Sequence, residues 1–311
     1  MSTSSPSRRP LGRAILVWTA RGLGVVAALL VVGVGAVYGV SSRRMSHSYT
    51  VRAHAIPVST DSAVIARGKH LAATRGCAEC HGENMAGHIM IDDPMFGRLA
   101  TANLTPGRPG GPLTAEQFEL AVRHGVGPSG RSLLLMPSQE FAHFSDDDVG
   151  ALYSYVRTLP AVTAPLPSPS VGPIARALGV AGAFELTPAR IIAQDAPHKA
   201  APPVGMTAEY GRYLAITCSG CHRQDFTGGP MPGGPPNAPP SANLTPDQEE
   251  GIGGWSEDDF VNALTTGERP DGPPINGEFM PIKMTKQMTD TEKRAIYRYL
   301  RTVEAKKAEK K

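Results

Sequence analysis

The chain has 311 residues, which is long enough for about two domains. Hydrophobic residues make up 41% and charged residues 19%, so there is enough apolar material for folded cores, and wholesale disorder is excluded. Aromatic residues make up 6%, while Gly and Pro number 34 and 29, a composition typical of short helices joined by long irregular loops. We therefore predict an all-α fold with much coil.

The formal net charge of +3 hides an uneven distribution along the chain. Residues 62–160 carry 8 basic and 10 acidic side chains, and residues 204–303 carry 9 and 13, whereas both ends of the chain are basic. A folded domain that binds nucleic acid shows the opposite balance. We therefore expect no nucleic-acid partner.

The N-terminal segment predicts a membrane-spanning helix. Residues 22–40 form a run of 19 residues without a charge, with four Arg before it and two directly after it. As a helix this run would be about 28 Å long, close to the ~30 Å of a bilayer core. We predict a cytoplasmic basic N-terminus at 1–21 and a transmembrane anchor at 22–40. A cleaved signal is the alternative, and either one sends the rest of the chain across the membrane.

The four cysteines fall in two identical patterns, CAECH at 77–81 and CSGCH at 218–222. Both read C-x-x-C-H, the signature of covalent c-type haem attachment, in which two thiols one helical turn apart bind the haem vinyl groups and the imidazole ligates iron. The predicted residues are Cys77, Cys80 and His81 in the first motif and Cys218, Cys221 and His222 in the second. A four-cysteine zinc site, disulfides or a thioredoxin-like pair are alternatives that leave both histidines unexplained.

Two methionines are candidates for the second axial ligand of each iron. Met136 lies 59 residues after Cys77, and Met280 lies 62 residues after Cys218; both are followed by Pro. Histidine is the rival ligand, offered by His88, His124 and His143 in the first half and by His198 for the second half. The matched position of the two methionines favours Met136 and Met280.

The chain contains an internal duplication. Ala-Asn-Leu-Thr-Pro begins at residue 102 and again at 242, and a helix with Tyr-x-Tyr-(Val/Leu)-Arg-Thr ends each half. The pattern predicts the same three helices in each half. The first leads into the haem motif, at 62–73 in one half and 208–216 in the other. The middle helix is capped at Thr114 or Ser256, and the last is capped at Ser145 or Thr289. The Asn-Leu-Thr triplet also matches a glycosylation pattern, but its repetition favours a role in a loop.

The segment between the two halves is rich in Pro and predicts a linker. The resulting boundaries are a first domain at 60–160, a linker at 161–203 wrapped over both domains, a second domain at 204–305 and a basic tail at 306–311. Within the linker, residues 174–186 predict a short helix, which we expect to pack at the domain boundary.

These motifs resemble a dihaem cytochrome c made of two mitochondrial-type cytochrome c domains. The chain is similar to the cytochrome subunits of membrane-bound, periplasm-facing alcohol and gluconate dehydrogenases, in which Asn-Leu-Thr-Pro followed by Gly-Ile-Gly-x-Trp-Ser is familiar; here these stand at 243–246 and 251–256. Those subunits usually carry three haems, and this chain has two motifs.

The resemblance implies two covalently bound haem c groups, with His81 and Met136 as axial ligands of one iron and His222 and Met280 of the other. It implies electron transfer without catalytic residues, between redox protein partners such as a dehydrogenase, an oxidase or another cytochrome. It also implies a single-pass protein of the inner (cytoplasmic) membrane with its haem domains in the periplasm. A dihaem enzyme, such as a peroxidase or a thiosulfate dehydrogenase, is the alternative.

Overall fold

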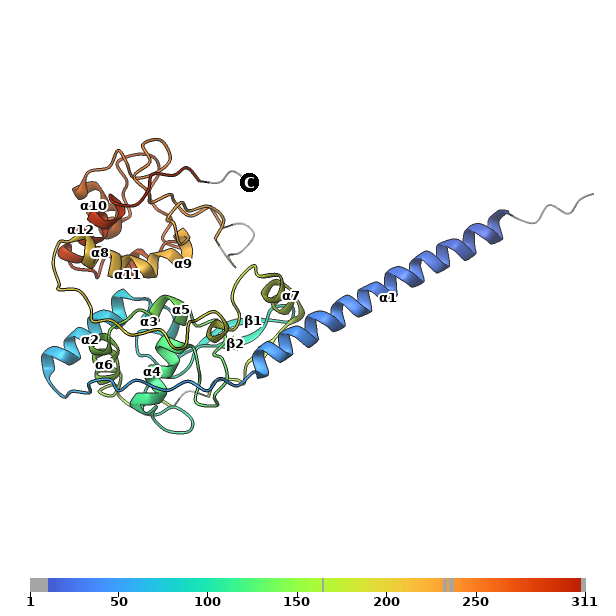
Figure 1. Ribbon diagram of the computed structural model, residues 1–311, viewed down its shortest axis with the longest axis horizontal. Helices are drawn as coiled ribbons and strands as arrows, with labels where there is room; N and C mark the ends of the chain where they lie inside the picture. The colour runs from blue at the N-terminus through green and yellow to red at the C-terminus, as the bar shows by residue number, and fades with distance from the viewer. Residues whose placement is uncertain (1–10, 164, 232–233, 235–237, 309–311) are drawn as a thin grey trace, which may run out of the picture.

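The computed structural model describes residues 11–163, 165–231, 234 and 238–308. The first ten residues of the predicted basic N-terminus and the last three of the predicted tail lie outside this part. The described chain is mostly helical, with a long helix leading to two stacked groups of short helices (Figure 1). This agrees with the expected helical content, apart from a small sheet that the sequence analysis did not predict.

Helix α1 (Leu11–Ser46) extends away from the rest of the molecule (Figure 1). Within the described residues it is the one helix long and apolar enough to cross a membrane, with a mean hydropathy of 2.4 and none of its apolar window buried. Its last turns pack against α7 (Pro173–Ala181). There Arg44 donates to the carbonyl of Gly179, and the Arg176 guanidinium lies over the Tyr38 ring and donates to Ser41.

The duplication predicted from the sequence is present in the described residues, element by element. The first copy contains α2 (Ser62–Thr74), α3 (Cys77–His81), α4 (Ala115–His124), α5 (Ser138–Phe141) and α6 (Asp146–Val156). The second copy contains α8 (Ala208–Ala215), η2 (Ile216–Cys218), α9 (Ser219–His222), α10 (Glu257–Thr266), α11 (Ile282–Thr285) and α12 (Asp290–Leu300).

The predicted helix starts are confirmed by their capping contacts. Thr114, Ser256 and Thr289 each form a complete capping box, and the Ser145 side chain accepts a hydrogen bond from the Asp148 backbone N–H. Each of these side chains supplies an acceptor to a backbone N–H of the first helical turn that has no partner within the helix. The sequence therefore places the middle and last helices of each copy through local hydrogen bonding.

A glycine in the first helix of each copy allows that helix to cross the last helix closely. A Cβ at Gly68 of α2 would lie 1.9 Å from the Ala151 carbonyl oxygen of α6. A Cβ at Gly211 of α8 would lie 1.8 Å from the Ala295 carbonyl oxygen of α12. The backbones can pack at this distance because glycine has no side chain.

One hydrophobic core forms around each of these helix crossings. Phe118 packs on Tyr153 in the first domain, and Phe260 packs on Tyr297 in the second, with ring centroids 5.4 and 5.6 Å apart. Each buried aromatic side chain contributes about 1.5–3 kcal/mol through removal of its surface from water. The cores therefore hold the long loops of each domain around a compact helical frame.

The linker packs along the first domain. In the described residues, strands β1 (Ile89–Asp93), β2 (Gly97–Ala100) and β3 (Ser170–Val171) form an antiparallel sheet, of which β3 belongs to the linker. The predicted linker helix is present as α7, but our expectation that it packs at the domain boundary is wrong, because it packs against α1. The short helix η1 (Pro188–Arg190) follows it and lies beside α5.

We predict that Gly211→Ala destabilises the second domain by about 3 kcal/mol, because the added methyl forces α8 and α12 apart. Gly254→Ala is the matched control, since a Cβ there meets nothing within 4 Å. Chemical unfolding followed by circular dichroism measures both variants. Equal midpoints for the two variants would contradict the close helix crossing.

Candidate functional site

The histidine of each C-x-x-C-H motif is held by a backbone carbonyl. His81 Nδ1 lies 2.8 Å from the Ala102 oxygen, and His222 Nδ1 lies 2.8 Å from the Ala242 oxygen. Since a carbonyl oxygen only accepts, Nδ1 carries the proton, and in the neutral ring Nε2 presents its lone pair. Burial lowers the pKa of both histidines, which favours this neutral form. Both rings are therefore prepared to ligate a metal through Nε2.

None of the four cysteines, all of which lie in the described part of the chain, forms a disulfide. Burial raises the pKa of Cys77 to about 12 and that of Cys218 to about 11. A reactive redox thiol needs a lowered pKa, because the thiolate is the nucleophile. The thioredoxin-like reading is therefore disfavoured, and the paired thiols suit covalent attachment of a prosthetic group.

The two methionines lie on the same hydrophobic clusters as the motifs that they were predicted to serve. Met136 packs on the first core together with Cys77, and Met280 packs on the second core together with Cys218. Each methionine precedes a Pro that begins a short helix, α5 or α11. The structure thus brings the first cysteine of the motif and the predicted methionine of each half together on one core.

The rival histidines are engaged elsewhere or face solvent. His143 donates from Nε2 to the Tyr213 carbonyl oxygen at 2.9 Å, and burial lowers its pKa to about 4. His124 pairs with Gln194, His198 lies in the linker beside Asp146, and His88 is exposed.

The repeated Asn-Leu-Thr triplets hold the segment that follows each last helix. Asn103 Nδ2 donates to the Val162 carbonyl oxygen at 2.7 Å, and Asn243 Nδ2 donates to that of Lys306 at 2.6 Å. Both asparagines are buried. This confirms the predicted loop role. The sequence analysis did not predict that the carbonyl of the preceding Ala accepts a hydrogen bond from the histidine of the motif. The signal available in the sequence was the presence of this Ala before Asn-Leu-Thr in both halves.

Two family models match the two halves of the chain. The model described as "Cytochrome C oxidase, cbb3-type, subunit III" covers residues 63–156, and the model described as "Cytochrome c" covers residues 208–304. Both domains belong to the cytochrome c family. The paired thiols and the neutral imidazoles with free Nε2 fit a covalently bound haem c in each domain. The cytochrome therefore carries two haem c groups.

The curated relatives are cytochrome subunits of dehydrogenases and a dihaem cytochrome. The chain is 31% identical over 272 residues to the fructose dehydrogenase cytochrome subunit of Gluconobacter japonicus, covering 80% of this chain and 54% of the relative. It is 29% identical over 283 residues to the gluconate 2-dehydrogenase cytochrome c subunit of Pantoea cypripedii, covering 80% and 61%. It is 28% identical over 273 residues to a diheme cytochrome c-type protein of Cereibacter sphaeroides, covering 77% and 86%. The chain thus spans little more than half the length of the dehydrogenase subunits.

The two haem-binding motifs lie on opposite sides of the domain interface, each beside a helix of the other domain. A Cβ at Gly220, inside the second motif, would lie 2.1 Å from the Glu140 carboxylate of α5 in the first domain. A Cβ at Gly76, directly before the first motif, would lie 3.8 Å from Met284 Sδ of α11 in the second domain. The helix that follows Met-Pro in each domain therefore lies beside the motif of the other domain. Burial at this junction raises the pKa of Glu140 to about 7.

Equivalent side chains of the two copies join the domains reciprocally. Glu292 occupies the third position of α12, and Asp148 occupies the same position of α6. His70 of α2 lies 2.8 Å from Glu292 Oε2, and Tyr213 of α8 donates its hydroxyl to Asp148 Oδ2 at 2.6 Å. Arg75, buried between the domains, adds a bond to Glu292 Oε1 at 3.1 Å. Each last helix is thus bound to the first helix of the other domain.

The first prediction from this interface concerns acid stability. Burial alone would raise the pKa of Glu292, but His70, Arg75 and the Thr289 N–H outweigh it and lower the pKa from 4.5 to about 2. A lowered carboxylate pKa stabilises the fold above pH 4.5, here by about 3 kcal/mol, and this contribution is lost as the pH falls through about 2.

Glu292→Gln should therefore lower the urea midpoint at pH 7, and the difference from wild type should shrink between pH 4.5 and 2. Gln also satisfies a capping box, so this change tests the charge. The exposed Glu278 provides the control, Glu278→Gln. A difference that does not change with pH would contradict the ionised buried carboxylate.

Another prediction concerns the proposed axial ligands, His81 with Met136 and His222 with Met280. Thioether ligation raises the reduction potential of a haem. We expect Met136→Ala and Met280→Ala each to lower one of two midpoint potentials and to remove part of the long-wavelength sulfur-to-iron band of the ferric protein. Met206→Ala, at a residue 38% exposed, should change neither. A band that survives in both variants would exclude these methionines as ligands.

Proposed function

We propose that this chain is a membrane-anchored dihaem cytochrome that relays single electrons in the bacterial periplasm, from a dehydrogenase or respiratory donor to an acceptor. The observation that carries this proposal is the contact of each C-x-x-C-H motif with the other domain, through Gly220 against Glu140 and Gly76 against Met284. The bound haems supply one-electron redox chemistry. The protein holds each motif against the other domain, and this arrangement suits internal transfer between two redox centres.

The axial residues support a carrier that performs no bond chemistry. His81 and His222 are fixed by their Nδ1 contacts to carbonyls, and the matched Met136 and Met280 lie on the same cores as the motifs. A redox centre with two protein ligands offers a substrate no position at the metal, whereas an enzyme needs an open one. We therefore favour a carrier over a peroxidase or thiosulfate dehydrogenase.

The N-terminal helix, the relatives and the charge of the two domains support the proposed location and partners. Helix α1 supplies an anchor, and the excess of arginines before its apolar run, four against two after it, favours a cytoplasmic N-terminus with the domains on the other side of the inner membrane. The relatives named as subunits of fructose and gluconate dehydrogenases support a donor of the dehydrogenase class. The excess of acidic residues on both domains favours partners with basic docking faces.

The test uses the full chain with both haems, in detergent or a nanodisc. Redox titration at a pH above the Glu140 pKa of about 7 should show two one-electron steps. There Glu140→Gln should raise both midpoint potentials, because Glu140 lies at the junction of both motifs and its negative charge stabilises the oxidised state. The exposed Glu116 gives the control, Glu116→Gln.

A shift of only one potential in Glu140→Gln would contradict adjoining redox centres. Turnover of peroxide or thiosulfate by the isolated protein at the rate of a dedicated enzyme would overturn the carrier in favour of the enzyme.

A further inference from the structure

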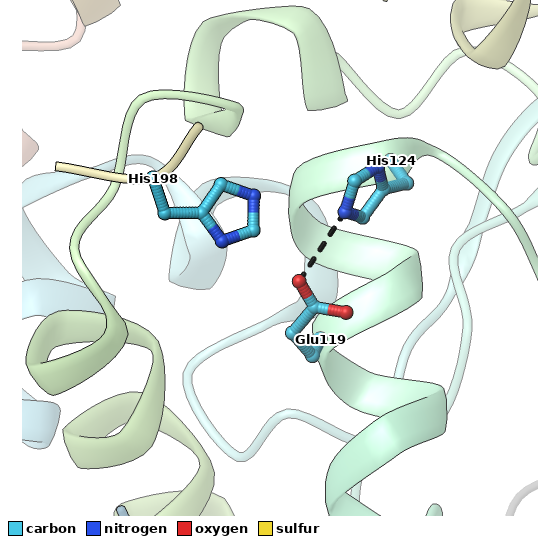
Figure 2. A group of neighbouring side chains, drawn as sticks. All are labelled: Glu119, His124 and His198. Carbon is cyan, nitrogen blue, oxygen red and sulfur yellow. Dashed lines mark ion pairs between the residues drawn. The ribbon is translucent and has the colours of Figure 1, made fainter. Parts of the chain in front are cut away.

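A buried cluster of metal-ligating side chains lies in the first domain, on residues that the haem motifs do not use. Glu119 and His124 project from α4, and His198 of the linker approaches them from the opposite side (Figure 2). One ligand atom from each of the three residues lies within 4.8 Å of the other two. Glu119 and His124 are 0% and 2% exposed, and the His198 side chain is 7% exposed.

The hydrogen bonds of Gln194 fix the protonation of His124. Gln194 Nε2 donates to the carbonyl oxygens of Ala189 at 2.8 Å and of His124 at 3.2 Å, so its Oε1 is an acceptor. This Oε1 lies 2.7 Å from His124 Nδ1, which must therefore carry a proton. In the neutral ring, Nε2 of His124 presents a lone pair into the cluster.

That lone pair faces a carboxylate. His124 Nε2 lies 3.3 Å from Glu119 Oε1, and Nε2 is buried without a hydrogen-bond partner; so are Glu119 Oε2 and His198 Nδ1. A buried polar atom without a partner is unfavourable by about 1–3 kcal/mol. Two acceptors that face each other need a positive charge between them, either a proton on Nε2 or a bound cation.

The charges around the cluster favour a cation. Arg123 bonds Glu119 Oε1 through Nε at 3.0 Å and Asp146 through a terminal nitrogen at 2.6 Å, so two carboxylates face one guanidinium. Asp146 Oδ1 also lies 3.5 Å from His198 Nδ1. The cluster thus keeps an excess of one negative charge.

His198 offers a donor atom to the cluster. Its ring lies on that of His54, with centroids 3.9 Å apart. Metals bind the neutral imidazole through the nitrogen that carries no proton, and His198 Nδ1 is buried without a hydrogen-bond partner.

We propose that Glu119, His124 and His198 form a binding site for a divalent transition-metal ion, with Zn²⁺ as the ion that fits. Two imidazole nitrogens and one carboxylate, with a further position for water, are a known zinc donor set. Gln194 plays the part of the outer partner that orients a ligating histidine. Donors about 2.0–2.2 Å from one ion would move closer together than the 4.8 Å limit of the metal-free cluster. The bound ion fastens the linker to α4.

The experiment uses the full, untagged, haem-loaded chain in detergent, in which thioether bonds remove the cysteines as competing zinc ligands. After treatment with chelator and addition of ZnCl₂, zinc is counted against haem iron by mass spectrometry, and its affinity is measured by competition with a chromophoric chelator. We expect one zinc per two haem irons. Zinc-edge X-ray absorption should show imidazole and oxygen donors.

His198→Ala should weaken zinc binding at least a hundredfold, whereas His88→Ala, which removes an exposed histidine, should leave it unchanged. Gln194→Ala keeps all three ligands and should weaken binding about 10–100-fold. Equal zinc affinity in wild type and His198→Ala, or no zinc retained at one equivalent, would overturn the site. The second result would mean that a proton on His124 Nε2 bridges to Glu119.

Discussion

A buried negative charge at the domain junction constrains the rest of this molecule. Glu292 is ionised inside the protein, and a buried carboxylate requires cationic or donor partners. His70 and Arg75, which supply them, belong to the other domain. The equivalent Asp148 is bonded in the same way by Tyr213 across the interface. Since α2 and α8 carry these partners and lead directly into the haem motifs, docking of the domains also sets the relation between the two redox sites.

Local signals made much of the fold predictable from the sequence. The capping residues Thr114, Ser256 and Thr289 act on backbone groups within their own turn, so the pattern alone places the helices. The small sheet escaped prediction because β1 pairs irregularly with β2 and because β3 has two residues and comes from the linker. Neither β1 nor β3 has the alternation of apolar and polar residues by which a strand is recognised in a sequence.

The candidate sites were predictable to the extent that their residues are close in sequence. Cys77, Cys80 and His81 form a continuous motif, whereas the carbonyl that orients His81 comes from Ala102, and backbone atoms leave no signature in composition. Pairs such as His70 with Glu292 are separated by 222 residues, and only the fold brings them together. The cluster of Glu119, His124 and His198 was invisible for the same reason, since His198 reads as part of a linker.

The continuation of α1 beyond its apolar run has a mechanical consequence. The predicted transmembrane segment ends at Val40, but the helix continues to Ser46, a rise of about 9 Å. Its last turns are joined to α7 through Arg44 and Arg176. In the proposed orientation the first domain is attached to the membrane through a continuous helix that packs against it, and not through a flexible linker. A tilt of the helix in the bilayer therefore changes the orientation of the domain. The distance between the domain and the lipid headgroups stays nearly constant, and so does the height at which a redox partner binds.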